Sequence, residues 1–468
     1  MLSDVESSRF SEKLPRARAW WRALKRAPFV LSCAVGLLAI ALRVAYLAVT
    51  PFNLRTHDVD GHVEYIEYLL SHHSFPPNDG GWSFYHPGLY FLISALQWKL
   101  LDLIHVSRGA ILVSLQAQSV LWELGYAAFA FAAARLWLDE LPEKSFGQGL
   151  LSRRALTALV AVLIAVWPAT IIHAVRIGND DLVYLFFGAS FYFTTRWWIR
   201  KRERDLHLAA VSSALGVVTK TNALVLFGIL GLLLLIHLAV REKERRPLVY
   251  LKRFAPMVVL AIASFAIALG SAIKDTLTGK RTSFFVGNSD WVTNKLIVGN
   301  RAENYIWFDL PAFVNHAFIS PWDDPPGRQW FWNYFLKTSL FGEFHFDSIF
   351  VWNVAVFISV AFLGLLVFAI GSEILGAFGL AWLPVTLTMT VLVASLAFLR
   401  MRHPWAPSAE FRYILPVLTP FLVAYLRGLT RCDERGWVRI ARGGALLGWI
   451  FAGLSIVLVV AIAAMKKP

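Results

Sequence analysis

Cysteine is almost absent from this sequence: only Cys33 and Cys432 occur among its 468 residues. Cys33 lies in an apolar run and Cys432 in a basic segment, so the pair indicates neither a disulfide framework nor a cysteine-based metal site. A P-loop, the glycine pattern of dinucleotide-binding proteins and a nucleophile elbow are also missing near any suitable helix start. The sequence therefore shows no site for cytosolic nucleotide chemistry.

Charged residues are scarce too, at 16% of the sequence, whereas hydrophobic residues make up 57%. Several apolar runs reach the roughly 20 helical residues that cross the hydrocarbon core of a membrane. Such runs must be helical, because a backbone in lipid has to satisfy its own hydrogen bonds. The 19 Trp and 35 Phe fit anchoring at the interface and packing against lipid. We therefore predict an all-α polytopic membrane protein embedded in a lipid bilayer.

The formal net charge of +14 does not indicate a nucleic-acid partner. Basic residues collect in short runs beside apolar segments, for example in 196–204 and 241–253, which is typical of cytoplasmic loops. Basic N-terminal residues likewise precede an apolar run that is too long for the core of a cleaved signal peptide. We predict no nucleic-acid binding and a first helix that stays in the membrane.

Residues 87–104 decide the topology, because they either cross the membrane or lie in its interface. If the N-terminus is cytoplasmic and this stretch does not cross, nearly all basic loops fall inside, as the positive-inside rule requires. Trp98, Lys99 and Asp102 also suit an amphipathic interfacial helix. Eleven predicted spans follow, at about 28–50, 110–136, 155–174, 182–199, 206–219, 223–240, 254–272, 349–370, 374–399, 412–429 and 444–464.

This topology divides the chain into four parts: a cytoplasmic segment 1–27, a transmembrane module 28–272, an outer loop 273–348 and C-terminal helices 349–468. The outer loop is rich in Trp, Phe, Asn and Pro, and a loop of this length without a function would be unusual. We expect it to fold as a cap. The C-terminal Lys466–Lys467 would lie outside, which is an exception to the positive-inside rule.

The first outer loop concentrates polar residues directly after the first span: Asp58 and Asp60, flanked by His57 and His62. A carboxylate here can act as a general base, or two can share a divalent cation. The alternative is that Asp58 or Asp60 only caps the helix that begins near Gly61. Further along, His86 precedes Pro87 at a predicted helix entry, where it can bind an anion or form an interfacial pair with Tyr85.

Three later outer segments are also richer in polar residues than solubility requires. The turn after the third span holds Arg176, Asn179 and Asp180, with helix capping as the alternative role, and Lys220 lies in a comparable turn. The last segment holds Arg400, Arg402, His403, Glu410 and Arg412. Basic residues on the outer side violate the positive-inside rule, and anion binding is the simplest reason. Arg43, inside the first span, either snorkels to the outer interface or has a functional role.

Taken in order, these residues resemble the C-type glycosyltransferase superfamily, most of all the group of the protein O-mannosyltransferases and the lipid A aminoarabinose transferases. In that family the first outer loop carries a catalytic Asp, usually followed by Glu and an aromatic-rich helix. Asp58 matches it best, with Glu64 and Tyr65 downstream. Val59 replaces the expected Glu, and Asp60 is the alternative within the pair.

Further matches lie on the same outer side. The segment 86–90 resembles a family motif in which His86 takes the place of a residue near the lipid phosphate. Asp180 resembles the second family acid, Thr219-Lys220 the Thr-Lys of the next outer turn, and 410–416 the start of an Arg-Tyr-x-x-Pro helix. The resemblance covers about 28–272 and is weaker afterwards.

The resemblance implies a polyprenyl-phosphate-linked sugar as donor, displaced at its anomeric carbon with inversion and with phosphate as the leaving group. The catalytic carboxylates would be Asp58, Asp60 and Asp180, and the donor phosphate would be bound by His86, Arg176, Lys220, Arg402 and Arg412. Asn179, Tyr85 and Glu410 would orient the substrates. No cofactor is certain, and a divalent cation stays open.

The expected function is thus transfer of a sugar to an acceptor protein, glycolipid or polysaccharide on the non-cytoplasmic face. Two other hypotheses are a flippase or transporter of lipid-linked sugars and a membrane scaffold without enzymatic activity. Transporters usually place charges near the midplane on broken helices, whereas the charges here lie at outer helix ends. The Ala-, Arg- and Trp-rich composition and the lack of an ER-retrieval ending favour a bacterial inner membrane.

Overall fold

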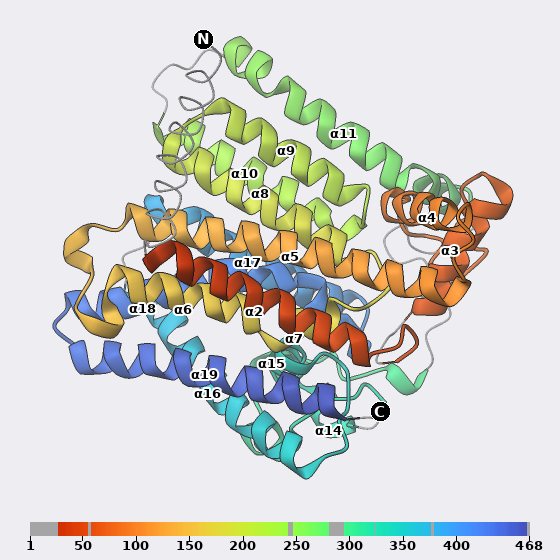
Figure 1. Cartoon of the computed structure of the whole chain (residues 1–468). Helices are drawn as coiled ribbons and strands as arrows, with labels where there is room; N and C mark the ends of the chain where they lie inside the picture. Colours follow the sequence, from red (N-terminus) through yellow and green to blue (C-terminus); the bar gives the residue numbers. More distant parts are fainter. Residues whose placement is uncertain are drawn as a thin grey trace, which may run out of the picture.

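The structure is a computed structural model that describes residues 27–54, 58–241, 247–279, 294–322, 324–375 and 379–465. This described part is almost entirely helical and holds no strand, only an isolated β-bridge between Ile297 and Trp405 (Figure 1). The predicted all-α class is confirmed.

The helices follow one another without sheet interruptions. Those of the first half are α2 (Ala27–Val49), α3 (Val59–His72), α4 (Leu89–Asp102), α5 (Arg108–Glu140), α6 (Arg153–Val166), α7 (Pro168–His173), α8 (Asp180–Arg200), α9 (Glu203–Val217), α10 (Leu224–Arg241) and α11 (Pro247–Leu277). Those of the second half are α12 (Glu303–Ile306), α13 (Leu310–Asn315), α14 (Pro325–Gln329), α15 (Phe331–Phe341), α16 (Ile349–Leu375), α17 (Leu383–Arg402), α18 (Leu418–Glu434) and α19 (Val438–Ala464). Two 3₁₀ segments used below are η3 (Thr221–Ala223) and η8 (Phe411–Val417).

Seven segments of the described part are long and apolar enough to cross a membrane. They are Arg153–His173, Thr221–Val240, Phe254–Leu277, Ile349–Gly371, Leu380–Arg402, Ala406–Glu434 and Val438–Ala464. Each of the eleven predicted spans coincides with a helix, but the number eleven itself is not confirmed. The predicted start at 374 is displaced: α17 begins at Leu383, because Pro384 suits the first helical turn.

Close packing of α5 against α8 depends on small residues. A Cβ placed on Gly188 would lie 2.9 Å from the Tyr126 ring, and one on Gly125 would lie 2.8 Å from Leu185. Glycine therefore lets the two backbones approach, as is common between helices in membranes. This approach holds the start of α8 at the same end of the bundle as the start of α5.

A helix break at Trp167-Pro168 separates α6 from α7. Pro168 cannot continue α6, which ends at Val166, and α7 starts anew at Pro168. The Trp167 indole at this break donates a 2.7 Å hydrogen bond to the Ser339 carbonyl oxygen of α15. The break therefore docks the outer segment onto the transmembrane helices.

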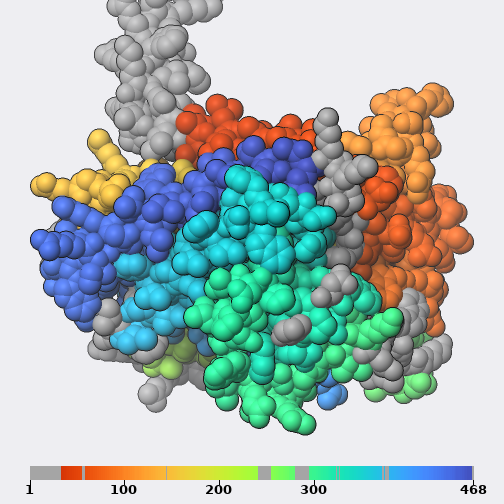
Figure 2. Space-filling model, turned by 90° about the horizontal axis from the view of Figure 1, so that it is seen from below, coloured from red at the N-terminus to blue at the C-terminus, as the bar shows by residue number. Residues whose placement is uncertain are grey.

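The described part of the segment 273–348, which the topology prediction puts outside, folds into α12–α15 and lies over the helices of the second half. Phe313, Tyr334 and Phe341 from it belong to the same apolar core as Leu159 of α6 and Phe421 of α18. In the view from below, the green to cyan residues of this region form the centre of the surface (Figure 2). Helices α3 and α4 lie at one end of the long helices (Figure 1).

Candidate functional site

The predicted outer residues lie at the ends of different helices. Asp58 follows α2, Arg176 follows α7 and Asp180 opens α8. Lys220 follows α9, and Arg412 lies in η8 ahead of α18. The contacts described next bring these five segment ends together on one side of the bundle.

Asp58 does not act as a helix cap. It occupies the N-cap position of α3 with a left-handed φ of 65°, and its side chain makes no capping hydrogen bond. Instead, its Oδ1 accepts a 2.6 Å hydrogen bond from Trp82 Nε1, and its Oδ2 lies 3.5 Å from Arg412 Nη2. Burial alone would raise the pKa of Asp58, but Arg412 and the Trp82 N–H hold it well below its usual range. The Asp58 carboxylate thus lies beside a cation that favours its ionised form.

Arg412 is buried between two carboxylates, since it pairs with Glu410 as well as with Asp58. The guanidinium carbon lies 5.2 Å from the centre of the Tyr413 ring. The Tyr184 hydroxyl donates a 2.7 Å hydrogen bond to the Arg412 carbonyl oxygen. This bond fixes η8 against α8 and so places the guanidinium.

Lys220 forms a second ion pair, with Asp180. Its Nζ lies 5.4 Å from the centre of the Tyr413 ring, so this ring lies near both cations. The Asn222 side chain donates a 3.0 Å hydrogen bond to the Tyr413 carbonyl oxygen, which joins η3 to η8. We call Asp58, Asp180, Lys220, Arg412 and Tyr413 the outer cluster, after the side on which the sequence predicts them.

The turn between α7 and α8 adds two further polar side chains. Asn179 is fully buried and donates a 3.3 Å hydrogen bond to the Thr219 carbonyl oxygen, while its Oδ1 has no partner among the described residues. Arg176 is also buried and donates to His173 Nδ1 at 3.2 Å. A Cβ on Gly178 would lie 3.4 Å from His62 Nε2, so the turn packs against α3.

His62 and His86 stack with ring centroids 5.8 Å apart, and Tyr85 lies against His86 at 4.1 Å. Burial lowers the pKa of His62 to about 4, although the charge of Asp58 opposes this shift. Burial and the charge of Lys220 lower the pKa of His86 well below its usual value. Both rings are therefore neutral at neutral pH, and His86 offers hydrogen bonds there and no positive charge.

Some predicted residues are not brought into the outer cluster. Asp60 is exposed on the first turn of α3, and Arg402 is exposed on the last turn of α17. His57 lies outside the described residues. Arg43 does not snorkel: it is fully buried and pairs with Glu123 of α5, because an arginine inside the bundle needs a counter-charge.

The predicted site does not include four residues that matter for the structure: three belong to or position the outer cluster, and Glu123 lies apart from it. Trp82 holds Asp58, Tyr413 lies near both cations, Tyr184 fixes η8, and Glu123 pairs with Arg43. Trp82 follows Gly80-Gly81 in a polar loop and Glu123 is an acid inside a predicted span, and both features are visible signals. Nothing in the sequence distinguishes Tyr184 from other membrane tyrosines.

The arrangement of acidic and metal-ligating side chains bears on the open question of a cation. Among the described residues, no three His, Cys, Asp or Glu side chains are grouped so that they could hold a metal ion. Asp58 faces Arg412 while Asp60 is exposed, so the Asp-x-Asp pair does not converge. Among the described residues, these two carboxylates therefore do not share one site.

No family model and no curated protein matches the sequence. Among solved structures, the apo oligosaccharyltransferase of Archaeoglobus fulgidus is similar, with 12% identity, a TM-score of 0.53 and coverage of 95% of this chain and 57% of that one. Archaeal oligosaccharyltransferase AglB from the same organism, in complex with an inhibitory peptide and a dolichol-phosphate, is also similar. It has 12% identity, a TM-score of 0.53 and coverage of 95% of this chain and 56% of that one. ArnT from Cupriavidus metallidurans bound to undecaprenyl phosphate has 14% identity, a TM-score of 0.39 and coverage of 87% of this chain and 78% of that one.

The chain thus spans little more than half the length of the archaeal enzyme. At 12% identity the likeness concerns the fold, and the expected resemblance to the C-type glycosyltransferases is confirmed at that level. The chain shares the fold of the archaeal oligosaccharyltransferase.

Proposed function

We propose that the protein is a membrane glycosyltransferase that moves a sugar from a polyprenyl-phosphate-linked donor to an acceptor on the non-cytoplasmic face of a bacterial inner membrane. The observation that carries this proposal is the convergence of Asp58, Asp180, Lys220 and Arg412 from four separate segments. Buried ion pairs rarely add net stability, so selection for stability does not account for two of them at one end of the bundle.

The cations of the site suit a phosphate. Lys220 and Arg412 lie near one tyrosine ring, and Arg176 is buried in the neighbouring turn. Charge-assisted hydrogen bonds from such groups stabilise the charge that grows on a leaving phosphate in a water-poor site. His86 and the Asn179 Oδ1, which lacks a partner among the described residues, supply neutral hydrogen-bonding groups for the substrates.

Asp58 is the proposed general base. In the free protein it is a weak base, because Arg412 and Trp82 favour its ionised form. A donor phosphate that binds Arg412 would share this cation and bring negative charge close to Asp58. Both effects raise the pKa of a carboxylate. Donor binding would thus make Asp58 a better acceptor for the proton of the incoming nucleophile.

Asp180 and Glu410 complete the proposed chemistry by holding the cations in position. Each carboxylate pairs with one cation in the free protein. When the phosphate takes over part of this pairing, a released carboxylate oxygen can accept a hydrogen bond from a sugar hydroxyl. Tyr85, whose ring lies against His86, would help to orient the acceptor.

The decisive experiment incubates purified protein with radiolabelled polyprenyl-phosphate sugars and acceptor fractions. The proposal expects label to leave the lipid and to appear in an acceptor. A flippase would instead move intact labelled lipid between leaflets of proteoliposomes without transfer. Retention of all label on the lipid with every sugar and acceptor class tested would reject the proposal.

Donor recognition is tested with Lys220→Ala and Arg412→Ala. Each removes a charge-assisted contact worth about 1.5–3 kcal/mol, so the donor KM should rise by roughly tenfold or more. Arg402→Ala is the matched control, because Arg402 is exposed at the end of α17. Unchanged donor dependence in both cluster variants, with folded protein, would remove them from the site.

A further inference from the structure

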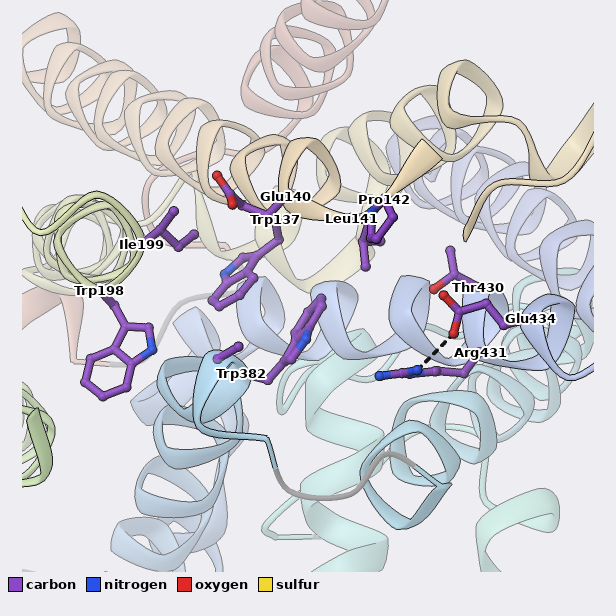
Figure 3. Close-up of a pocket in the computed structure, with 11 residues that line it drawn as sticks. Trp137, Glu140, Leu141, Pro142, Trp198, Ile199, Trp382, Thr430, Arg431 and Glu434 are labelled. Atoms are coloured by element: carbon purple, nitrogen blue, oxygen red, sulfur yellow. Dashed lines mark hydrogen bonds and ion pairs between the residues drawn. The ribbon is translucent and has the colours of Figure 1, made fainter. Parts of the chain in front are cut away.

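A cavity lies at the end of the same helices that is opposite to the outer cluster. It has a volume of about 740 Å³, within the size range of small-molecule sites. Residues from the ends of α5, α8 and α18 and from the turn just before α17 line it (Figure 3). From Asp180 to Trp198 along α8, the rise of 1.5 Å per residue gives about 27 Å. The cavity is therefore separated from the outer cluster by about the thickness of a hydrocarbon core.

Tryptophan forms the wall of this cavity. The rings of Trp137 and Trp382 stack with centroids 4.6 Å apart and an angle of 19°. Figure 3 shows these two rings face to face, with Glu140 above Trp137 and Arg431 extending from α18 beneath them. The third tryptophan, Trp198, donates a 3.0 Å hydrogen bond to the Leu380 carbonyl oxygen.

The indole N–H of Trp137 indicates a ligand. Trp137 is only 3% exposed, yet its Nε1 has no hydrogen-bond partner among the described residues. A buried tryptophan usually finds an acceptor for this group, because leaving it unpaired costs free energy. A ligand oxygen in the cavity would supply the missing acceptor.

The charged side chains that line the cavity indicate which other groups the ligand carries. Arg431 and Glu434 already pair at 2.9 Å. Glu140 is exposed at the rim, and no contact to it is recorded in the described part. The faces of Trp382 and Trp198 are covered by Arg427 and Lys201, at 4.4 and 4.5 Å. A ligand cation would therefore pair with Glu140, while its oxygen anion would bind the Trp137 N–H and the remaining donors of Arg431.

We propose that this cavity binds the headgroup of a membrane phospholipid that carries both a phosphate and a primary ammonium group, of the phosphoethanolamine type. Its place favours a lipid over a soluble molecule, because three tryptophans at one level of a helix bundle mark the depth of lipid headgroups. Leu380 beside the cavity is 42% exposed, which leaves apolar surface for the acyl chains. The proposal is independent of the transferase reaction.

The test compares nanodiscs and soluble headgroup probes. Purified protein should retain phosphatidylethanolamine over phosphatidylglycerol in native mass spectra, and glycerophosphoethanolamine should quench tryptophan fluorescence. Trp137→Phe keeps the stacked ring and removes the N–H, and Glu140→Gln removes the charge. Each should weaken retention about tenfold or more. Glu143→Gln is the matched control, since Glu143 pairs with Arg153 and does not line the cavity.

The outcomes distinguish between the possible ligands of the cavity. Glycerol phosphate that binds as well as glycerophosphoethanolamine would mean a simple anion site and would overturn the assignment. Tight binding of the soluble probe without lipid retention would mean a soluble phospho-amine ligand and would overturn it as well. Equal retention by wild type, Trp137→Phe and Glu140→Gln, all with unchanged melting temperature, would reject the cavity as the binding site. Loss of retention in both variants, with the control unaffected, supports it.

Discussion

Asp58 combines a left-handed backbone with a side chain that faces a cation. Aspartate and asparagine tolerate positive φ better than most residues, and both oxygens of Asp58 are used outside the helix. Backbone strain of this kind is commonly kept at functional positions. The substitution that separates its chemistry from its conformation is therefore Asp58→Asn.

Asp58→Asn should leave the protein folded and reduce turnover by roughly 10² or more. Asparagine suits the same φ and can accept the Trp82 hydrogen bond, but it cannot take up a proton at neutral pH. Transfer rates at saturating donor are the measurement, with melting temperature as the check on folding. Asp60→Asn is the control, because Asp60 is exposed, and should keep near-normal turnover. If both variants turn over normally, the base has to be sought at Asp180 or Asp181.

The buried His62 should make the protein sensitive to mild acid. Its pKa falls from 6.5 to about 4 on folding, so below pH 6.5 the unfolded chain takes up a proton that the folded site refuses. Stability then falls by about 1.4 kcal/mol per pH unit, or about 2 kcal/mol at pH 5. Asp58 does not contribute in this window, because its pKa lies below 3.8 and its stabilisation is lost only at lower pH.

The melting temperature measured between pH 7 and pH 5 tests this expectation. His62→Phe should make the decline shallower, and the remainder is due to His86, whose pKa is lowered by burial as well. His72→Phe, at an exposed position near the end of α3, should leave the decline unchanged. A decline that stays equally steep in His62→Phe would assign the acid sensitivity to other groups, His86 first among them.

At the scale of the residue, most members of the outer cluster can be predicted from the sequence. Which acid pairs with which cation cannot. Charged groups beside membrane helices are costly and usually have a function. This argument predicts a role for Asp58, Asp180, Lys220 and Arg412. The choice between Asp58 and Asp60 depends on the left-handed turn before α3, which no local pattern reveals. The neutral state of His86 depends on burial by distant segments, so it also could not be derived from the sequence.

Among the elements, α2 and α5 are joined by a buried ion pair. Arg43 of α2 pairs with Glu123 of α5, and further donates to the Ala165 carbonyl at 2.8 Å and to the Thr170 hydroxyl at 3.0 Å. The guanidinium thus connects α2, α5, α6 and α7. Such a network fixes how helices meet more than it adds to net stability.

Removal of one partner should therefore be more harmful than removal of both. Arg43→Met leaves Glu123 buried without its counter-charge and should destabilise the protein by about 3–5 kcal/mol, and Arg43→Met/Glu123→Met should recover most of this. Arg108→Met, at the exposed pair with Glu67, should cost no more than about 1 kcal/mol. Unfolding in detergent measures all three, and a harmless Arg43→Met would contradict the proposed role of the pair.

The helices themselves were well predicted because long apolar runs in lipid have few alternatives to the helix. Their ends were less well predicted. Trp167-Pro168 divides one predicted span into α6 and α7, and α17 begins well after the predicted 374. Packing against α15 and the position of a proline decide these ends, and packing depends on residues far away in the sequence.

At the scale of the whole molecule, the outer cluster and the tryptophan cavity lie at opposite ends of α8 and α18. The topology that places the outer cluster outside is tested by cysteine labelling, in a background of Cys33→Ala and Cys432→Ala. Ser74→Cys, exposed after α3, should react with a membrane-impermeant thiol reagent in intact cells. Arg202→Cys, exposed between α8 and α9, should react only after the membrane is permeabilised. The reverse pattern would turn the protein around in the membrane.

The meeting of Asp58 with Arg412 also has a consequence during biosynthesis. Asp58 leaves the ribosome early, whereas its cationic partner is made only after α17. At about 5–20 residues per second, the interval is on the order of tens of seconds. Throughout that time the nascent chain carries Asp58 without the guanidinium of Arg412, so the cluster is incomplete. The enzyme proposed here would therefore be inert while it is being inserted, and would become competent only when the second half of the chain docks.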